Sequence, residues 1–257
     1  MIDEPYRWIE AVRNRREYLE DQLASGSALV ALPYREGILM ATFGSGSSKI
    51  FEVYDRIAFG GLGHPTDLEK IRTFVLEFAH LEGFNRSPAD VNLQRLIKFG
   101  VAPLMKQAFE EILRAPFILR PLFAELTHSF SAPIFFTLDY DGLFEESNQF
   151  GVAAPSDRTG KRMEQFLRSG LASGPPDLQS ALQLAMRAWA LSLPGSAPDS
   201  EDQGLPGPER LDQLLRELSG LRKPEVALLD RALPGASKYR SLDENAIRDL
   251  TRGWLNP

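Results

Sequence analysis

Ser27 is the residue of this chain with the most direct chemical possibility, because it follows Gly26 and precedes a short apolar run. A chain that cleaved itself after Gly26 would expose the serine at a new N-terminus, where the free α-amine could act as its base. An alcohol needs such a base, because it is a poor nucleophile at neutral pH. The alternative is that Ser27 closes a helix and begins a strand with a small polar side chain. The residue pair alone therefore allows a catalytic and a structural role.

Two other segments contain residue types that often act in catalysis or in ligand binding. Asp139 and Asp141 flank a turn, and Glu145 and Glu146 follow it closely. Carboxylates at a turn are normally solvated, so we interpret this group as an exposed hairpin and not as an acid–base pair. Residues 43–48 are rich in glycine and serine, but they lack the lysine–threonine ending and the following helix of a phosphate-binding loop. We therefore expect a flexible loop there.

Composition excludes several kinds of site. The 257 residues include no cysteine, which rules out disulfides, thiol catalysis and cysteine-ligated zinc. His64, His80 and His128 are scattered without ligand spacing, so we expect no metal centre and no cofactor. A net charge of -6 argues against nucleic-acid binding, because phosphate recognition needs clustered Lys and Arg. Neither a signal peptide nor a membrane span is indicated, and we expect a cytoplasmic protein.

The first quarter of the chain predicts a helix and two strand pairs that would position Ser27. Apolar residues recur at helical spacing between charged ones from Pro5 to Leu23, which is typical of an amphipathic helix. Four short runs rich in apolar, aromatic or branched side chains follow and predict two antiparallel strand pairs. These runs are residues 28–32 and 37–42, joined by a turn at 33–36, and residues 49–55 and 56–63.

The middle of the chain changes from a strand period to a helical period. The first helix here is predicted to have Thr66 as its N-cap and to end at Gly83. A second, longer helix begins near Pro88 and extends to Ile112, with a kink at Pro103 because proline cannot donate a backbone hydrogen bond. Strands are then predicted at residues 117–126 and 134–138, with a turn at 140–142 leading into a returning run that ends near Val152.

The C-terminal part alternates helices and strands around one irregular segment. Helices are predicted after Ser156 and Asp177, and a last helix has Asp243 at its N-cap. Residues 193–209, rich in proline, glycine, serine and acids, predict a loosely held surface insertion with a short helix after it. Late strands are predicted at residues 225–230 and 237–241. Strand blocks separated by helix pairs favour one domain, 1–257, built as a four-layer α+β sandwich of two stacked antiparallel sheets with helices outside.

Seven stretches of this sequence, in their order and spacing, resemble a proteasome α subunit, most closely of the bacterial (actinobacterial) type. They are SGS at the end of the first helix, ALVALPYREGILMAT, SSKIFEVYDRIAFGGLG, TDLEKIRTFVLEFAHLEGFNRSPADV, FTLDYDGLFEESNQFGVAAPS, DLQSALQLAMRAWAL and PEVALLDRALPGASKYRSL. The likeness covers nearly the whole chain except residues 193–222, which that pattern does not require and which we treat as a surface insertion.

This resemblance implies the four-layer αββα fold of the Ntn hydrolases, with an extra helix at the N-terminus. It also implies a non-catalytic subunit: a ring, expected to have seven copies, stacks on rings of catalytic β subunits and gates substrate passage. Residues 1–25 would supply the gate tail and the ring-top helix, with only Met1–Arg7 available as the tail. The expected partners are further copies of this chain, the β subunits, protein substrates in transit and a ring-shaped ATPase or other activator.

The same resemblance weakens the case for catalysis by Ser27. In the catalytic relatives the nucleophile is an N-terminal threonine; Ser27 stands at its position, and Lys49 at that of the lysine that tunes the site. The expected aspartate is replaced by Phe43, and a Ser-Gly-Ser cluster by residues 153–157. Losing these groups should lower the rate by orders of magnitude. Two alternatives stay open: an autoprocessed Ntn hydrolase that uses Ser27, and a self-assembling ring protein without any protease.

Lys49 has a second expected role. In the α family the lysine of the S-x-K-I segment faces a pocket between neighbouring subunits and receives the C-terminal carboxylate of activator tails, and SSKIF matches that segment. Gly63 is expected to line the same pocket with its backbone. The alternatives are a solvated lysine at a strand start and a glycine needed only for turn geometry. The resemblance therefore predicts an activator-tail pocket at Lys49 and Gly63 and no catalytic residue.

Overall fold

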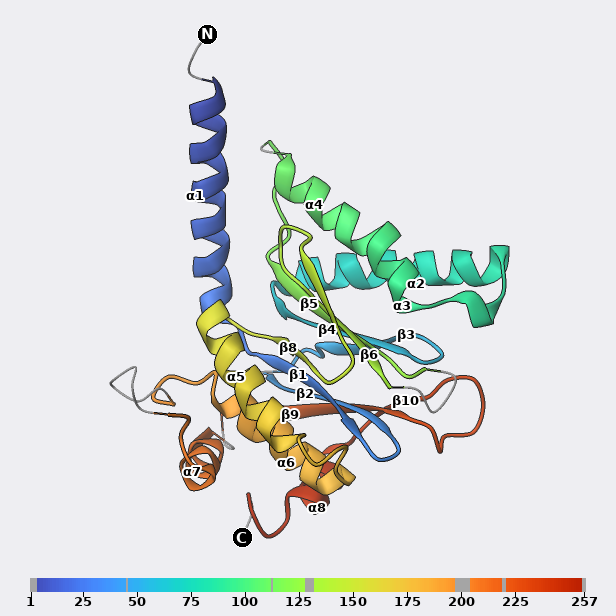
Figure 1. Ribbon diagram of the computed structural model, residues 1–257, viewed down its shortest axis with the longest axis vertical. Coiled ribbons are helices and arrows are strands. Elements are labelled where there is room, and N and C mark those ends of the chain that lie inside the picture. Colours follow the sequence, from blue (N-terminus) through green and yellow to red (C-terminus); the bar gives the residue numbers. More distant parts are fainter. Residues whose placement is uncertain are drawn as a thin grey trace.

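Two five-stranded antiparallel sheets are stacked between outer layers of helices (Figure 1). The computed structural model describes residues 4–44, 46–111, 113–127, 132–196, 204–218 and 221–255. The strand order is β10-β9-β2-β1-β8 in the first sheet and β3-β4-β5-β6-β7 in the second. This arrangement confirms the predicted four-layer α+β sandwich.

The first sheet contains the hairpin that follows Ser27. Its strands are β1 (Leu29–Tyr34), β2 (Gly37–Gly44), β8 (Gly151–Ala153), β9 (Lys223–Asp230) and β10 (Tyr239–Ser241). The hairpin turn is shorter than the predicted 33–36, because Pro33 pairs with Ile38 and Tyr34 with Gly37. Pro33 is tolerated in β1 because β8 pairs with β1 only over Leu29–Ala31, so the proline lies beyond the part of β1 that has strands on both sides.

The second sheet corrects one prediction about the run after the turn at 140–142. Its strands are β3 (Ile50–Tyr54), β4 (Ile57–Gly63), β5 (Leu119–Glu125), β6 (Ile134–Leu138) and β7 (Phe144–Ser147). The predicted return strand ending near Val152 is two strands, because β7 pairs with β6 whereas β8 joins β1 in the other sheet. The crossing is tight, since a side chain at Gly151 would collide with Leu122 of β5.

Helices α2, α3 and α4 cover the outer face of the second sheet. Helix α2 (Pro65–Asn85) has His64 as its N-cap, and not Thr66, because the His64 Nδ1 accepts the Thr66 N–H at 3.2 Å. The long second helix is also interrupted and begins later than predicted. It consists of a 3₁₀ turn at Pro88–Asp90, α3 (Leu93–Leu96), a π turn at Ile97–Val101 and α4 (Ala102–Glu110).

The predicted kink near Pro103 takes the form of that π turn, which ends two residues before the proline. A π turn widens the hydrogen-bond pattern by one residue, and Pro103, which has no N–H, sits in the first turn of α4, where a missing donor is tolerated. The predicted end at Ile112 lies outside the described residues.

Helices on the outer face of the first sheet begin where the sequence predicts. They are α5 (Asp157–Gly170), α6 (Leu178–Ala190), α7 (Pro208–Leu218) and α8 (Glu244–Thr251). Ser156, Asp177 and Asp243 cap α5, α6 and α8 by accepting backbone N–H groups, which confirms the predicted cap at Asp243. Within the predicted insertion, Leu211 and Leu215 of α7 are buried against the core, and residues 197–203 lie outside the described part.

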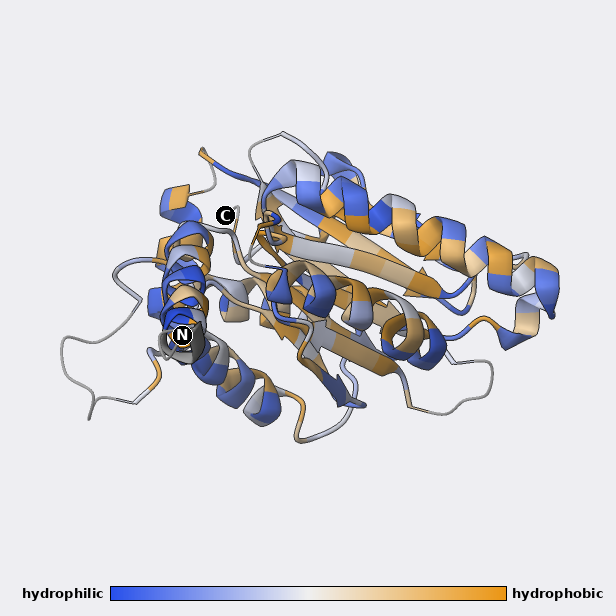
Figure 2. Ribbon diagram, turned by 90° about the horizontal axis from the view of Figure 1, so that it is seen from above, coloured by the Kyte–Doolittle hydropathy of each residue, from blue (hydrophilic) through white to orange (hydrophobic). Residues whose placement is uncertain are grey.

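Three apolar clusters fill the space between the layers: one under α5–α8, one between the two sheets and one under α2–α4. The strands are accordingly coloured mostly as hydrophobic, whereas α1 (Glu4–Ala24) is mostly hydrophilic (Figure 2). Helix α1 extends away from the sandwich (Figure 1). Among the described side chains of α1, Leu19 and Leu23 alone are fully buried in the core, while Trp8 and Ile9 are 46% and 57% exposed.

Candidate functional site

Ser27 lies in the short linker between α1 and β1, at the base of the helix. Its side chain is buried, and its Oγ donates to the Phe43 carbonyl at 2.6 Å. The same oxygen accepts the Trp189 indole N–H at 3.0 Å. The Trp189 and Phe43 rings are in contact beside the hydroxyl, with centroids 4.0 Å apart and planes tilted by 31°. Both hydrogen-bonding functions of Ser27 are therefore used within the fold.

This arrangement has no proton acceptor for the Ser27 hydroxyl other than a main-chain carbonyl. Phe43, which stands where the resemblance places an aspartate, contributes a ring and that carbonyl. A carbonyl oxygen cannot remove the proton of an alcohol at neutral pH, so activation of this oxygen needs a base that its hydrogen-bond partners do not supply. Gly26 is fixed by close contact, since a side chain there would meet Leu62 of β4 at 2.6 Å.

Lys49 lies directly before β3, where the two sheets are joined by a carboxylate. Glu225 of β9, in the first sheet, accepts the backbone N–H of Lys49 at 2.9 Å and that of Ile50 at 3.0 Å. The Tyr239 hydroxyl of β10 donates to the Ile50 carbonyl at 3.0 Å. The main chain of this segment is thus held by the first sheet, while the Lys49 side chain takes no part in these contacts.

The Lys49 ammonium is half-buried beside a second cation. Burial lowers the pKa of Lys49, the charge of Arg222 lowers it further, and Glu225 partly opposes both effects. Burial raises the pKa of Glu225, although the N–H groups of Lys49 and Ile50 work in the other direction. No carboxylate of the described residues lies within ion-pair distance of the Lys49 ammonium.

Arg222 and Glu225 are residues that sequence reasoning missed. They stand more than 170 positions after Lys49 and reach it only because β9 pairs with β2 and the two sheets are stacked. Nothing in the sequence around Arg222 and Glu225, near the start of β9, indicates that these residues lie beside Lys49.

Gly63 is the last residue of β4 and has a backbone geometry that requires glycine. Its φ is +147°, and a side chain would collide with the Ile118 carbonyl, which also accepts the His64 N–H at 2.8 Å. Because Ile50 pairs with Gly60, position 49 faces position 61, and Gly63 lies two residues, or about 7 Å, further along the strand. Lys49 and Gly63 therefore lie at the same end of the second sheet, as the predicted pocket needs.

A buried arginine at this end of the second sheet organises a third group of charges. Arg120 of β5 is 5% exposed and donates to Asp139 at 3.0 Å and to Glu20 of α1 at 2.7 Å. It also donates to the Ala154 and Pro155 carbonyls at 3.0 and 2.9 Å. These bonds connect α1, the β6–β7 turn and the loop before α5, so Arg120 fixes the base of the projecting helix.

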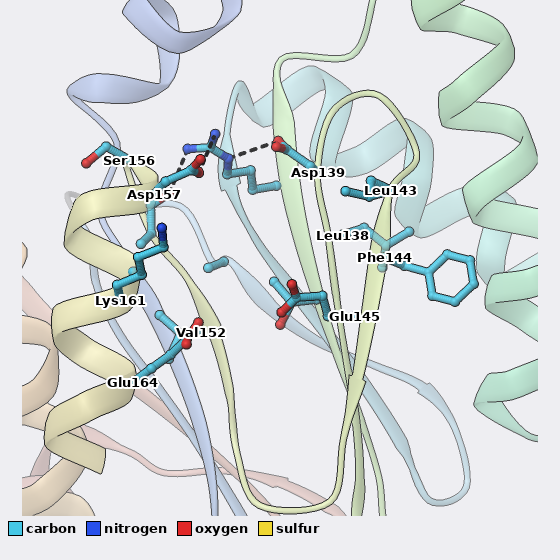
Figure 3. Close-up of a pocket in the computed structure, with 15 residues that line it drawn as sticks. Leu138, Asp139, Leu143, Phe144, Glu145, Val152, Ser156, Asp157, Lys161 and Glu164 are labelled. Atoms are coloured by element: carbon cyan, nitrogen blue, oxygen red, sulfur yellow. Dashed lines mark hydrogen bonds and ion pairs between the residues drawn. The ribbon is translucent and has the colours of Figure 1, made fainter. Parts of the chain in front are cut away.

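The same guanidinium lines a pocket of about 300 Å³ between the edges of the two sheets. Figure 3 shows Asp139 and Asp157 at its upper rim, joined by dashed lines to one guanidinium, and Glu145 and Glu164 facing each other below. Burial and the charge of Glu145 raise the pKa of Glu164. Ser156 is occupied as the α5 cap, so none of these groups pairs a nucleophile with a base.

The histidines take separate places. His64 caps α2, the His80 ring packs edge-on to Tyr54 at 5.3 Å, and His128 lies outside the described residues. In the part of the chain that the structure describes, no three potential metal ligands come together. None of the helices described there combines the length and apolar character that crossing a bilayer requires.

Fold and site together define a class of protein: a four-layer sandwich in which Ser27, the potential nucleophile, is buried and hydrogen-bonded within the fold. Similarity to known proteins then identifies the relatives. The chain is 27% identical over 247 residues to the proteasome subunit alpha of Streptosporangium roseum, covering 95% of this chain and 84% of that protein. It is 28% identical over 244 residues to that of Actinosynnema mirum, with 94% and 84% covered.

A third relative is the proteasome subunit alpha of Saccharomonospora viridis, 27% identical over 245 residues, with 94% of this chain and 87% of that protein covered. No protein-family model matches the chain. The resemblance seen in the sequence is confirmed over nearly the whole chain, which is similar to the proteasome α subunits of several actinobacteria.

Proposed function

We propose that this chain is the non-catalytic α-type subunit of a 20S-like proteasome core, forming an outer ring that restricts substrate passage to catalytic β subunits. The observation that carries the non-catalytic role is the enclosure of Ser27, whose oxygen is held between Phe43 and Trp189. The similarity to proteins named as proteasome α subunits supports the wider assignment.

The projecting helix supports ring formation. A groove of about 600 Å³ runs between α1, α4 and the β6–β7 turn, and Trp8, Val12 and Phe109 line it. Leu143 at its edge is 70% exposed, and Arg16 bridges the groove to Asp141 at 3.0 Å. An exposed apolar face on a helix that projects from its own domain needs a covering partner.

We assign this groove to a neighbouring copy. The chain is similar to proteins that are named subunits, and a groove on one side of the molecule makes a head-to-tail contact that can close into a ring. Residues 1–3, which would form the beginning of the gate, lie outside the described part.

Activator docking is assigned to the edge formed by Lys49 and Gly63, with Arg222 as a further cation. A carboxylate that reaches this edge would meet an ammonium with no ion-pair partner among the described residues. A single charge-assisted contact gives weak binding, but several tails of one activator ring raise the effective concentration of each other, so modest contacts become usable affinity.

Co-expression with a β-type subunit from the same genome tests the assignment. We expect a stacked-ring particle by electron microscopy, which also gives the number of copies in each ring, and peptide hydrolysis that needs the β subunit. A chain that stays monomeric beside an assembled β subunit would contradict the proposal. A ring without any β partner would instead favour a self-assembling ring protein.

Intact mass spectrometry tests the remaining alternative, an autoprocessed hydrolase that uses Ser27. We expect no loss of the segment before Ser27, because the hydroxyl is occupied and α1 is tied to Arg120. A mass that lacks residues 1–26, or a covalent adduct of Ser27 with an electrophilic inhibitor, would support the hydrolase and contradict the α-type role.

A further inference from the structure

A separate pocket lies at the opposite end of the first sheet from Ser27 and Lys49. It has a volume of about 610 Å³ and is bordered by the β1–β2 turn, the β7–β8 loop and the α5–α6 loop. The β1–β2 turn and the α5–α6 loop lie side by side at the lower end of the molecule (Figure 1). They are joined there by the Arg35 N–H, which donates to the Pro176 carbonyl at 2.9 Å.

Three arginines from three segments line this pocket: Arg35, Arg168 and Arg231. No acidic residue is among the lining side chains of the described chain. Arg35 and Arg168 form no ion pair with the described residues. Burial and the nearby charge of Arg56 lower the pKa of Arg231, which indicates that cations are concentrated there. The lining thus carries positive charge, and the acids that interact with these two arginines, Asp177 and Glu164, lie outside the lining.

Three acids lie near the pocket but outside its lining. Asp230 accepts the Ala232 N–H at 2.9 Å and pairs with Arg240 at 3.5 Å. Asp177 caps α6 through Ser180. Glu36 is exposed to solvent in the turn.

Tyr34 adds a donor at the wall of the pocket. Its side chain is 3% exposed, and its hydroxyl lies close to Asp230 without a well-formed hydrogen bond to any described residue. Burial raises the pKa of Tyr34, and Asp230 and Glu36 raise it further, so the hydroxyl keeps its proton. A buried polar group is normally hydrogen-bonded, which makes an unused donor beside a pocket an indication of a missing acceptor.

We propose that this pocket binds a small organic anion, with its acidic group among the arginines and the Tyr34 hydroxyl and its apolar body against Leu171 and the neighbouring prolines. Guanidinium groups recognise carboxylate and phosphate oxygens in pairs of parallel hydrogen bonds. The volume lies in the range of small-molecule sites, and the mixture of apolar surface with a few polar groups is typical of them.

Calorimetric titration of the purified full chain tests the proposal with four probes: 1-naphthoate, 1-naphthyl phosphate, the neutral 1-naphthamide and inorganic phosphate. We expect the two aromatic anions to bind and the amide and inorganic phosphate to bind at least about tenfold more weakly. Whichever of the two anions binds more tightly then identifies the preferred acidic group as carboxylate or phosphate. Equal binding of the neutral amide, or no binding of either aromatic anion, would overturn the proposal.

Two variants locate the binding. Arg168→Gln should lower the affinity for the tighter-binding anion by about tenfold, because it removes one guanidinium from the exposed wall of the pocket. Tyr34→Phe should weaken binding severalfold and change the melting temperature little, since the hydroxyl makes no well-formed hydrogen bond in the unliganded fold. Arg158→Gln, on α5 outside the pocket lining, serves as the charge-matched control. Unchanged affinity in both test variants would place the anion elsewhere.

Discussion

Arg120 and Lys49 are two cations at the same end of the second sheet, separated by β4, and they differ in what their donors do. The Arg120 guanidinium is enclosed and bonded to two carboxylates and two carbonyls. At Lys49 only the backbone is engaged, by Glu225, and the ammonium is left without an ion pair in the described chain. A cation whose donors are all used stabilises the fold, whereas a cation held in place by its backbone keeps its charge for a ligand.

Ser27 belongs with Arg120 in this comparison. Its hydroxyl is as fully engaged as the guanidinium, although both residues are of types that perform chemistry elsewhere. The residue type therefore indicates a possible role, and the use of its hydrogen bonds within the fold decides between structure and function.

The largest effect is expected from Arg120→Met, which removes the cation whose donors are used within the fold. Removing one partner from a buried charge network leaves the other charges unsatisfied and costs about 3 kcal/mol or more. For a chain of this size that corresponds to a fall in melting temperature of roughly 6–12 °C, measured by calorimetry.

Arg120→Lys is the matched control, because it keeps the charge but not the fork, and it should fall between wild type and Arg120→Met. Helix α1 should also become more susceptible to proteolysis, since Glu20 loses its partner. An unchanged melting temperature would show that the network does not stabilise the fold.

A smaller loss of stability is expected from Ser27→Ala. The change leaves the buried Trp189 indole N–H without an acceptor and costs about 1–3 kcal/mol in urea unfolding. Peptide hydrolysis by the assembled particle, corrected for the amount of particle, should not change. Activity that disappears with no change in stability would contradict the structural role of Ser27.

Lys49→Ala removes the cation that we propose binds a ligand. Its effect on the free energy of unfolding should stay within about 0.5 kcal/mol, because the ammonium has no ion pair among the described residues to lose. The measurement is the ratio of activator-stimulated to unstimulated peptide cleavage, which should fall to about one if the carboxylate contact is needed. Lys223→Ala is the control: this nearby lysine pairs with Glu244 at 2.6 Å on the surface, and its loss should leave stimulation intact. Equal stimulation in both variants would remove Lys49 from the docking edge.

The smallest and most specific effect is a pH dependence of activator binding. Only the protonated ammonium attracts a carboxylate, and the pKa of Lys49 is lowered by burial and by Arg222. As the pH rises through this lowered pKa, Lys49 loses its charge earlier than an ordinary lysine, so affinity should decline at alkaline pH. Arg222→Gln should shift the decline to higher pH while weakening binding at neutral pH, as measured by titration of an activator-tail peptide. A decline at the same pH in both proteins would contradict this coupling.

Much of the fold could be predicted because its signals are local. The caps Ser156, Asp177 and Asp243, the strand pairs and the final helix follow from side chains that act on their own backbone. One error falls where a distant segment competes with local preference: Gly151 lies in β8 because that segment crosses to pair with β1. The other error is local, because His64 caps α2 by accepting the N–H of Thr66, the residue expected as the cap.

By itself, the sequence determined most of the helices and strands, the four-layer class and the absence of an aspartate beside Ser27, because these depend on residue type and period. Only the tertiary structure decided that Trp189 encloses Ser27, that Arg120 holds α1 and that Glu225 and Arg222 lie beside Lys49. These contacts join residues that are 100 or more positions apart, so they exist only after the sheets have paired and stacked. Whether a donor is used or left for a ligand is a property of that packed state and has no signature in the local sequence.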